Sequence, residues 1–317
     1  MKNTLHDINI YLTQKQQGLI NTLLESNPII ASLPVKPASH GFYNVYSKVA
    51  DIDVMEEVDY DEELPTVGIS FDLGKTRLGK IGGKLPMPHD AAKEMGGYAK
   101  YADDRVPQII ARSGNNNEAS IYYNGFFKYA LANGNMVSAG GTTANKQYSM
   151  IAVHYDEDST VGLYNPNSLS NGKMFETLFL NGGNEYEIEY APGKKCIGKM
   201  IAMFMELGLQ LADPRFVAGI VNIEPSQNAT DHEKIDGLPT RMQIEDMLAK
   251  VRANAANTFI YCHPTIVGYL ALKFQLPQRT ITNETANIRY TLTDWNGVQF
   301  IGSYNVNWGK EAVVTLS

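Results

Sequence analysis

Residues 51–84 read DIDVMEEVDYDEELPTVGISFDLGKTRLGKIGGK, an acidic block followed by a glycine-rich basic block. Between the blocks, apolar residues at positions 67, 69, 71 and 73 alternate with polar or small ones, which indicates a β-strand. Together with the strand-like stretch 42–58, this pattern predicts a long hairpin. Its return arm runs through three glycines to Pro86 and Pro88, so we expect it to be flexible and to bury little surface by itself. A hairpin of this kind needs a partner on which to pack.

The charged blocks dominate the charge of the whole chain. Eight acids lie within residues 51–63, and without them the 27 basic residues would face 26 acids, a net charge of +1 instead of −7. Opposite charges on neighbouring arms can attract each other or a second copy, although a solvated charged loop remains the alternative interpretation. The candidate contact residues are Asp51, Asp53, Glu56, Glu57, Asp59, Lys75, Arg77, Lys80 and Lys84.

Composition places the chain among globular proteins. Its 317 residues are 44% hydrophobic and 19% charged, outside the range of disordered chains. The first residues are too polar for a signal peptide, so we expect the mature chain to begin as written. The longest apolar stretch, 196–211, is too polar and too short to span a bilayer. Two cysteines, Cys196 and Cys262, favour buried thiols in a reducing compartment and cytoplasmic synthesis.

The N-terminal half predicts mainly helices. A broken helical period over residues 5–26 indicates a helical arm, which ends before a proline-rich connector. Some helical turns follow at 90–111. A clearer helix starts among residues 115–117 and ends near Asn133-Gly134, with Tyr122 and Phe126 on one side.

The remaining stretches mix strands and helices. Residues 147–164 and 216–223 are strand-like, whereas 201–211 fits a strand and a helix equally well. A capping box at Thr240–Gln243 predicts a helix to about residue 255, followed by a strand at 258–262 and a helix at 264–274. Asn296-Gly297 between 290–295 and 298–301 predicts a terminal β-hairpin.

Motifs for chemistry are absent or fail in context. Residues 74–81, GKTRLGKI, nearly match a phosphate-binding loop, but Ile81 replaces the required hydroxyl residue and no helix can follow. Cys262 and His263 are adjacent in a strand and so point to opposite faces, which favours a core thiol and a helix-start histidine over a catalytic pair. His154 and His232 lack metal-site spacing. We expect no catalytic, cofactor or metal site, and the dispersed basic residues argue against a sequence-specific reader of nucleic acid.

The order of the predicted elements resembles the capsid subunits of tailed bacteriophages with the Hong Kong 97 fold. Local sequence is similar to a group of short-tailed phages related to epsilon-fifteen, in three places. These are Asn116-Asn117 with Tyr123-Asn124-Gly125-Phe126, residues 145–166 with the ending Gly162-Leu163-Tyr164-Asn165-Pro166, and Asp213-Pro214-Arg215-Phe216-Val217 leading to Asn222-Ile223. The similarity covers most of the chain from about Val67, but not 171–190, 226–235 or the arm before Phe42.

This resemblance implies an α+β fold with an N-terminal arm at 1–39 and an extended E-loop at 40–89. A P-domain would follow at 90–224, with a spine helix at about 116–133 and part of the A-domain. The A-domain would continue at 225–288, and a C-terminal β segment at 289–317 would return to either domain.

The implied function is that of a non-enzymatic major capsid protein, assembled in the host bacterial cytoplasm and located in the virion. Its copies would form hexamers and pentamers around double-stranded DNA, which they contact without sequence specificity. A portal protein and, in some systems, scaffolding and decoration proteins would be further partners, with no membrane involved. An encapsulin-type cellular shell protein and an enzyme using Cys262 or the glycine-rich segment are the alternatives. Some relatives crosslink lysine to asparagine, for which Asn296, Asn305 and Asn307 are candidates.

Overall fold

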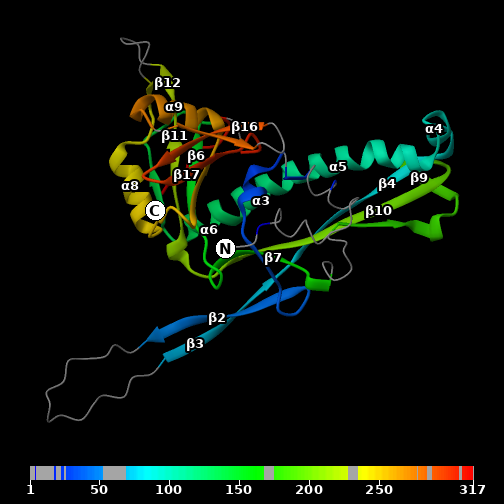
Figure 1. Cartoon of the computed structure of the whole chain (residues 1–317), viewed down its shortest axis with the longest axis horizontal. Coiled ribbons are helices and arrows are strands. Elements are labelled where there is room, and N and C mark those ends of the chain that lie inside the picture. Colours follow the sequence, from blue (N-terminus) through cyan, green and yellow to red (C-terminus); the bar gives the residue numbers. More distant parts are fainter. Residues whose placement is uncertain are drawn as a thin grey trace.

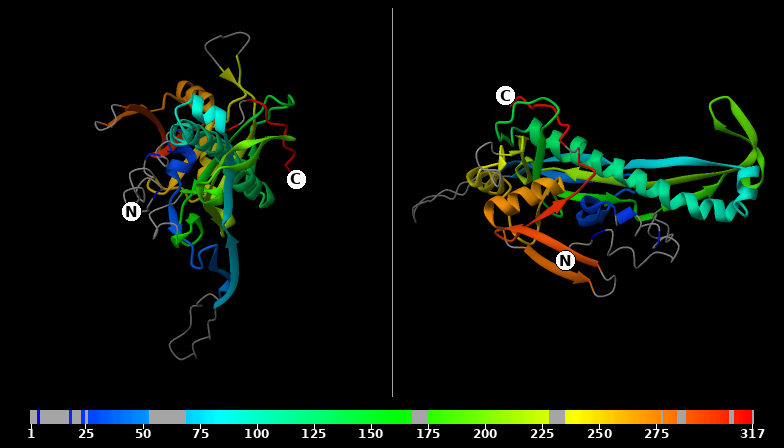
Figure 2. Two further views of the ribbon diagram at one scale, coloured as in Figure 1. Left: turned by 90° about the vertical axis from the view of Figure 1, so that its right-hand side faces the viewer. Right: turned by 90° about the horizontal axis from the view of Figure 1, so that it is seen from above.

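One helical run and two β-sheets build the body of the chain, from which a hairpin projects (Figure 1). The computed structural model describes residues 4, 18, 23–24, 26–52, 69–167, 175–227, 235–276, 278–283, 288–306 and 309–316. At one end of the elongated body the long helix runs beside the longest strands. At the other end a compact sheet is covered by two helices, as Figure 2 also shows.

The first sheet is built around one long strand. Its main path is β1-β7-β10-β4, and β8 and β9 also pair with β10. The strands are β1 (Val35–Pro37), β4 (Gly79–Pro88), β7 (Thr160–Tyr164), β8 (Phe175–Phe179), β9 (Tyr186–Ala191) and β10 (Lys194–Leu211).

Residues 201–211, whose apolar pattern fits both a strand and a helix, form the C-terminal part of strand β10. Ile201, Met203 and Met205 are buried, while the residues between them are half exposed, so alternation over two residues decides the conformation. The buried side shares the main core with the long helix, and the residues on the other side of the strand are half exposed.

The expectation of a flexible return arm was wrong for residues 79–88. They form β4, which pairs antiparallel with β10 over ten residues, from Gly79 opposite Leu207 to Pro88 opposite Gly198. Leu85 and Met87 on this strand are buried in the main core. Glycines that weaken an isolated strand are tolerated here because β10 supplies the ladder and the core.

The long helix starts earlier than the sequence predicted. α5 (Tyr98–Ser120), the π-helical η2 (Ile121–Phe127) and α6 (Lys128–Ala132) form one run, so its start near residue 116 was placed too late. Buried residues recur every four positions: Ala102, Val106, Ile110, Gly114, Glu118, Tyr122, Phe126 and Ala130. A step of four residues advances about 40° around an α-helix, so the buried stripe winds around the helix and meets successive partners.

The second sheet has the order β15-β16-β17-β14-β6-β11-β5. Its strands are β5 (Met136–Ser138), β6 (Tyr148–His154), β11 (Val217–Ile223), β14 (Thr258–Cys262), β15 (Gln278–Asn283), β16 (Ile288–Trp295) and β17 (Val298–Gly302). Helices α8 (Arg241–Lys250) and α9 (Pro264–Phe274) share a second core with these strands. Strands from both sides of the expected border at 224/225 therefore belong to one sheet.

Two local predictions in this region are confirmed. Thr240 and Gln243 form the capping box of α8 with both of its hydrogen bonds. Trp295 pairs with Val298 across a two-residue turn, in which Asn296 and Gly297 both have positive φ. β15, which pairs with β16, was not predicted.

The N-terminal arm is described only in part. Leu23 and Leu24 are buried, and α3 (Pro28–Ser32) follows them, whereas Leu5, Ile8, Leu12 and Leu19 lie outside the described residues. The remaining short elements are α4 (His89–Glu94), η3 (Leu180–Gly183), η4 (Pro214–Phe216), β12 (Ser226–Gln227) and β13 (Ile235–Asp236). None of the described helices is long and apolar enough to cross a membrane.

Candidate assembly surfaces

The projecting hairpin consists of β2 (Tyr43–Ile52) and β3 (Ile69–Arg77). The two strands pair only with each other in the described part of the chain (Figure 1). Leu73 is 80% exposed, and the ring of Tyr46 lies so close to Gly74 that a Cβ there would be 2.4 Å from it. The two strands are paired along the hairpin, with one shift of register between Val49 and Asp51, and the hairpin exposes a large apolar side chain.

Buried amides attach the base of the hairpin to the first sheet. Asn44 donates a hydrogen bond of 2.6 Å to Gln210 on β10, and the Leu78 N–H donates to the Phe42 carbonyl. Both amide side chains are buried, so breaking this contact would leave unpaired polar groups. The direction in which the hairpin leaves the body is thus well defined.

The four basic candidates lie on both strands that follow the acidic block. Lys75 and Arg77 are on β3, Lys80 and Lys84 are on β4, and all four are exposed. The Nζ atoms of Lys75 and Lys80 lie 3.8 Å and 3.7 Å from the ring centres of Tyr43 and Phe204. None of the four forms an ion pair within the described residues.

The acidic candidates cannot be placed in the same way. Asp51 is on β2 opposite Ser70, and its side chain is not described. Asp53, Glu56, Glu57 and Asp59 lie outside the described residues. The predicted contact between the two blocks therefore stays a prediction.

A cleft of about 470 Å³ lies where the hairpin meets the sheet. Arg77, Lys80, Glu176 and Glu206 bring both signs of charge to its wall. Phe42, 59% exposed, lines it as well. The surface at the hairpin base thus combines charges of both signs with accessible aromatic area.

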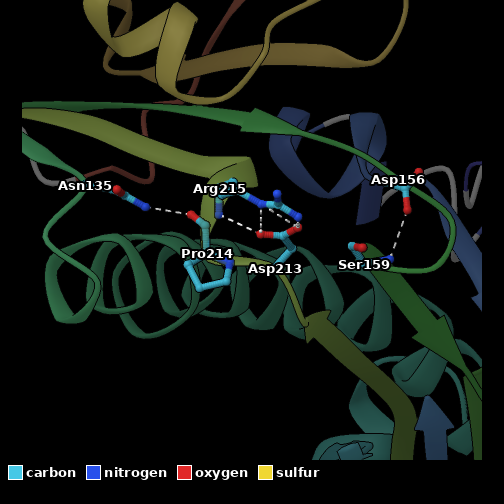
Figure 3. A network of polar contacts seen from close by, with 6 residues as sticks. All are labelled: Asn135, Asp156, Ser159, Asp213, Pro214 and Arg215. Atoms are coloured by element: carbon cyan, nitrogen blue, oxygen red, sulfur yellow. Dashed lines mark hydrogen bonds and ion pairs between the residues drawn. The ribbon is translucent and has the colours of Figure 1, made fainter. Parts of the chain in front are cut away.

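A polar network holds the connection between β10 and β11 (Figure 3). Arg215 binds both carboxylate oxygens of Asp213, with Nη2 2.6 Å from Oδ2, and these hydrogen bonds lower the pKa of Asp213. Asn135, just after the long helix, donates a hydrogen bond of 2.6 Å to the Pro214 carbonyl. The segment Asp213–Val217, which carries the resemblance, therefore joins the end of the helix to the start of a buried strand.

Two buried carboxylates connect the long helix to chain ends. Burial raises the pKa of Glu118 to about 7; the side chains of Ser303 and Asn305 and the backbone N–H groups of α3 partly oppose the rise. Neither Glu118 oxygen has a hydrogen bond of standard geometry within the described residues. Burial likewise raises the pKa of Glu311 to about 7, against hydrogen bonds from Tyr123 and Ser149. The burial of these two glutamates could not be predicted from the sequence, because an isolated glutamate is normally exposed.

The residues considered for chemistry have structural positions. Cys262 is fully buried, which raises the pKa of its thiol to about 12, and His263 Nδ1 accepts the Thr265 N–H at the start of α9. The glycine-rich stretch 74–81 lies in β3 and β4, so no helix end is available for phosphate. His154 Nδ1 lies 3.1 Å from Thr258 Oγ1, and His232 is outside the described residues. The described side chains contain no cluster of three or more potential metal ligands.

Asparagines considered for crosslinking make contacts inside the subunit. Asn296 donates to Glu245, and Asn305 donates to the Ser26 carbonyl and to Asn27. Asn307 is outside the described residues.

This architecture of a long helix on an elongated sheet, a second helix-covered sheet and a projecting hairpin is that of phage capsid subunits with the Hong Kong 97-like fold. A chain in the near-atomic structure of bacteriophage Epsilon15 is similar, with 12% identity, 88% of this chain and 85% of that chain covered, and a TM-score of 0.52. The capsid of bacteriophage JBD30 is similar at 9% identity, with 86% and 88% covered and a TM-score of 0.50. Both similarities concern the fold. Comparison with curated protein sequences gave no match.

A family model assigns the sequence directly. The model described as major capsid protein GP7 matches residues 120–303, more than half of the chain. The chain belongs to this family of major capsid proteins. It is a structural protein of a tailed-phage virion that associates with copies of itself in an icosahedral shell.

Proposed function

We propose that copies of this chain form hexamers and pentamers in which the β2–β3 hairpin of each subunit packs on its neighbour. The observation that carries the proposal is the hairpin itself, which projects from the body and exposes 80% of Leu73 (Figure 1). A two-stranded hairpin is at best marginally stable in water, so a second subunit is its natural support. Ring contacts between identical chains join two different patches, here the hairpin and a site on the next body.

Charge supports the same arrangement. The four basic candidates have no ionic partner within the described residues, and eight acids lie within residues 51–63 of every copy. Complementary charges across an interface set register and speed association more than they add affinity. The hairpin of one subunit and the basic strands of another would therefore find a unique alignment.

Charge reversal tests this role. Changing Lys75, Arg77, Lys80 and Lys84 to Glu moves the net charge from −7 to −15. Reversing the exposed Lys93, Lys100, Lys146 and Lys250 makes the same change elsewhere and is the matched control. We expect the first variant to fold, by circular dichroism and thermal unfolding, but to give few particles, and the control to assemble. Normal particles from the first variant would refute the proposed contact.

The assembled shell would enclose double-stranded DNA, with a portal protein at one vertex. Contact with DNA would be non-specific, since the basic residues are dispersed along the sequence. Assembly would take place in the host bacterial cytoplasm, with scaffolding or decoration proteins where the phage encodes them. Nuclease-protected DNA in particles from infected cells would support this content, and enzyme cargo in place of DNA would favour the cellular shell alternative.

A further inference from the structure

The outward face of the long helix is polar and carries no acid. Buried positions recur every four residues along this run, from Ala102 to Ala130. A residue two positions further along lies about 200° around an α-helix, so the intervening series faces away from the core. Six successive members of this series are all exposed, and none is apolar or acidic: Gln108, Arg112, Asn116, Ser120, Asn124 and Lys128.

Positive charge is unopposed along this face, although the chain has a net charge of −7. The single acid between positions 105 and 133, Glu118, is fully buried. On the first sheet, by contrast, Lys195 Nζ lies 2.9 Å from a carboxylate oxygen of Glu187. The exposed charged residues between positions 105 and 133 are all basic, and none of them forms an ion pair within the described part of the chain: Arg105, Arg112 and Lys128.

Hydrogen bonds connect neighbouring side chains of this face. Lys128 Nζ donates a hydrogen bond of 2.7 Å to Asn124 Oδ1, and Asn124 Nδ2 donates one of 3.1 Å to Ser120 Oγ. An ammonium group has three donors, so Lys128 keeps two of them for a ligand. Because these side chains are already ordered along a helix, they would lose less conformational entropy when a ligand binds.

The length and chemistry of the face fit a nucleic-acid duplex. Residues 108–128 extend over about 30 Å at 1.5 Å per residue, close to the ~34 Å of one turn of B-DNA. Arg, Lys, Asn, Gln and Ser are the side chains that hydrogen-bond to phosphate oxygens without reading bases. A protein partner fits less well, because the cores of protein interfaces are enriched in aromatic residues and depleted of charged ones.

We infer that the outward face of the long helix, residues 108–128, binds the phosphate backbone of the double-stranded DNA inside the shell. The inference rests on the proposed DNA content and specifies the surface that meets the DNA. Three cations and four neutral donor side chains on one helix would give contact without sequence specificity, even though the basic residues are dispersed along the whole sequence.

Photochemical crosslinking in particles tests this surface directly. One variant carries the photoreactive residue p-benzoylphenylalanine in place of Asn116, at the centre of the face. The control carries it in place of Leu178, which is 57% exposed on β8 of the first sheet. Both variants are supplied to infected cells, and only particles with nuclease-protected DNA are irradiated. The protein is then denatured and digested with nuclease, and the nucleotides that remain attached are measured.

We expect nucleotides attached to the chain substituted at Asn116, and at least about tenfold fewer attached to the chain substituted at Leu178. Equal attachment at the two positions, attachment at Leu178 alone, or attachment at neither would overturn the inference. Crosslinks from position 116 to protein instead of DNA would overturn it as well. Particles that lack protected DNA would instead refute the proposed content, so the two failures can be distinguished.

Salt dependence of DNA binding provides a second test, which does not need particles. Arg112→Glu with Lys128→Glu moves the net charge from −7 to −11, and Lys93→Glu with Lys250→Glu makes the same change at exposed positions elsewhere. Circular dichroism first establishes that both variants fold. Fluorescence anisotropy of a labelled duplex then gives the dissociation constant of each purified chain between about 50 and 200 mM salt.

Each phosphate contact contributes about 0.9 to the slope of log K against log salt, so loss of two contacts should lower the slope by about 1.8. We expect this loss for the Arg112 and Lys128 variant, and a slope like that of the unaltered chain for the control. An unchanged slope in the first variant, an equal loss in both, or no binding by the unaltered chain at the lowest salt would contradict the inference.

Discussion

Tyr123 on the long helix donates a hydrogen bond to Glu311, 188 residues further along the chain. Ser149 on β6 donates a hydrogen bond of 2.9 Å to the same carboxylate, and the Tyr122 hydroxyl lies 2.9 Å from the Ser149 hydroxyl. The C-terminal segment is therefore attached to the helix and the second sheet through one buried acid. This contact has a pH dependence that follows from its burial.

Glu311 should make the subunit less stable as the solution becomes more alkaline. Its pKa is about 7 in the folded chain against an ordinary value of 4.5, so the folded state holds the proton more tightly. The stabilisation is complete below pH 4.5 and disappears as pH rises through 7, on the order of 1–3 kcal/mol. Glu311→Gln should flatten this part of the pH profile, measured by denaturant unfolding at several pH values. An unchanged slope would contradict the burial of this group.

Glu118 gives a second, separable test in the same pH window. Its pKa is also raised to about 7, and its oxygens lack standard hydrogen bonds within the described residues. Glu118→Gln removes a buried charge and should raise the free energy of unfolding at pH 8, by roughly 1–3 kcal/mol, with little change at pH 5. Glu94→Gln, at an exposed position on α4, is the control. Destabilisation at pH 8 would indicate that the ionised carboxylate is needed.

Neighbouring glycines on β4 should respond in opposite ways to alanine. A Cβ at Gly82 would lie 2.6 Å from the Met203 carbonyl oxygen, a backbone atom that cannot move without disturbing β10. Gly82→Ala should therefore destabilise the subunit by about 1–3 kcal/mol. Gly83→Ala meets nothing within 4 Å and should be neutral or slightly stabilising. Thermal unfolding of both variants measures the difference, and equal melting temperatures would contradict the tight pairing of β4 and β10.

Phe126 should be essential to the contact between the long helix and the second sheet. Its ring is fully buried, stacks on Tyr261 at 5.9 Å and meets the edge of Tyr155 at 6.4 Å. Phe126→Ala should cost about 3–5 kcal/mol, measured by denaturant unfolding. Leu131→Ala, at a residue 37% exposed on α6, should cost less than half of that. Similar losses in the two variants would contradict this packing.

Local signals in the sequence identified elements whose conformation depends on near neighbours. The alternation at 67–73, the capping box of Thr240 and the Asn296-Gly297 turn each specify a short segment by its own chemistry. The structure has the capping box, the turn and a strand from Ile69, where its description of this segment begins. The ambiguous stretch 201–211 needed the burial of Met203 and Met205 against the helix before its period could be assigned.

Features that depend on distant residues could not be read from the sequence. Residues 98–120 are largely polar and contain Pro107, and their buried stripe includes Gly114 and Glu118, so the stripe is only partly apolar. Glycine-rich β4 is ordered by β10, more than a hundred residues away. An apolar groove combines side chains from β4, β10, the long helix and the N-terminal arm, and no single stretch of sequence predicts it.

Electron microscopy of the purified chain, expressed alone and together with the neighbouring genes of its phage, tests the central claim most directly. We expect closed shells or rings of five and six subunits in at least one preparation, and the shell diameter would then begin to define the lattice. A uniform small monomer in both preparations would contradict the assignment of this chain as a self-assembling shell subunit.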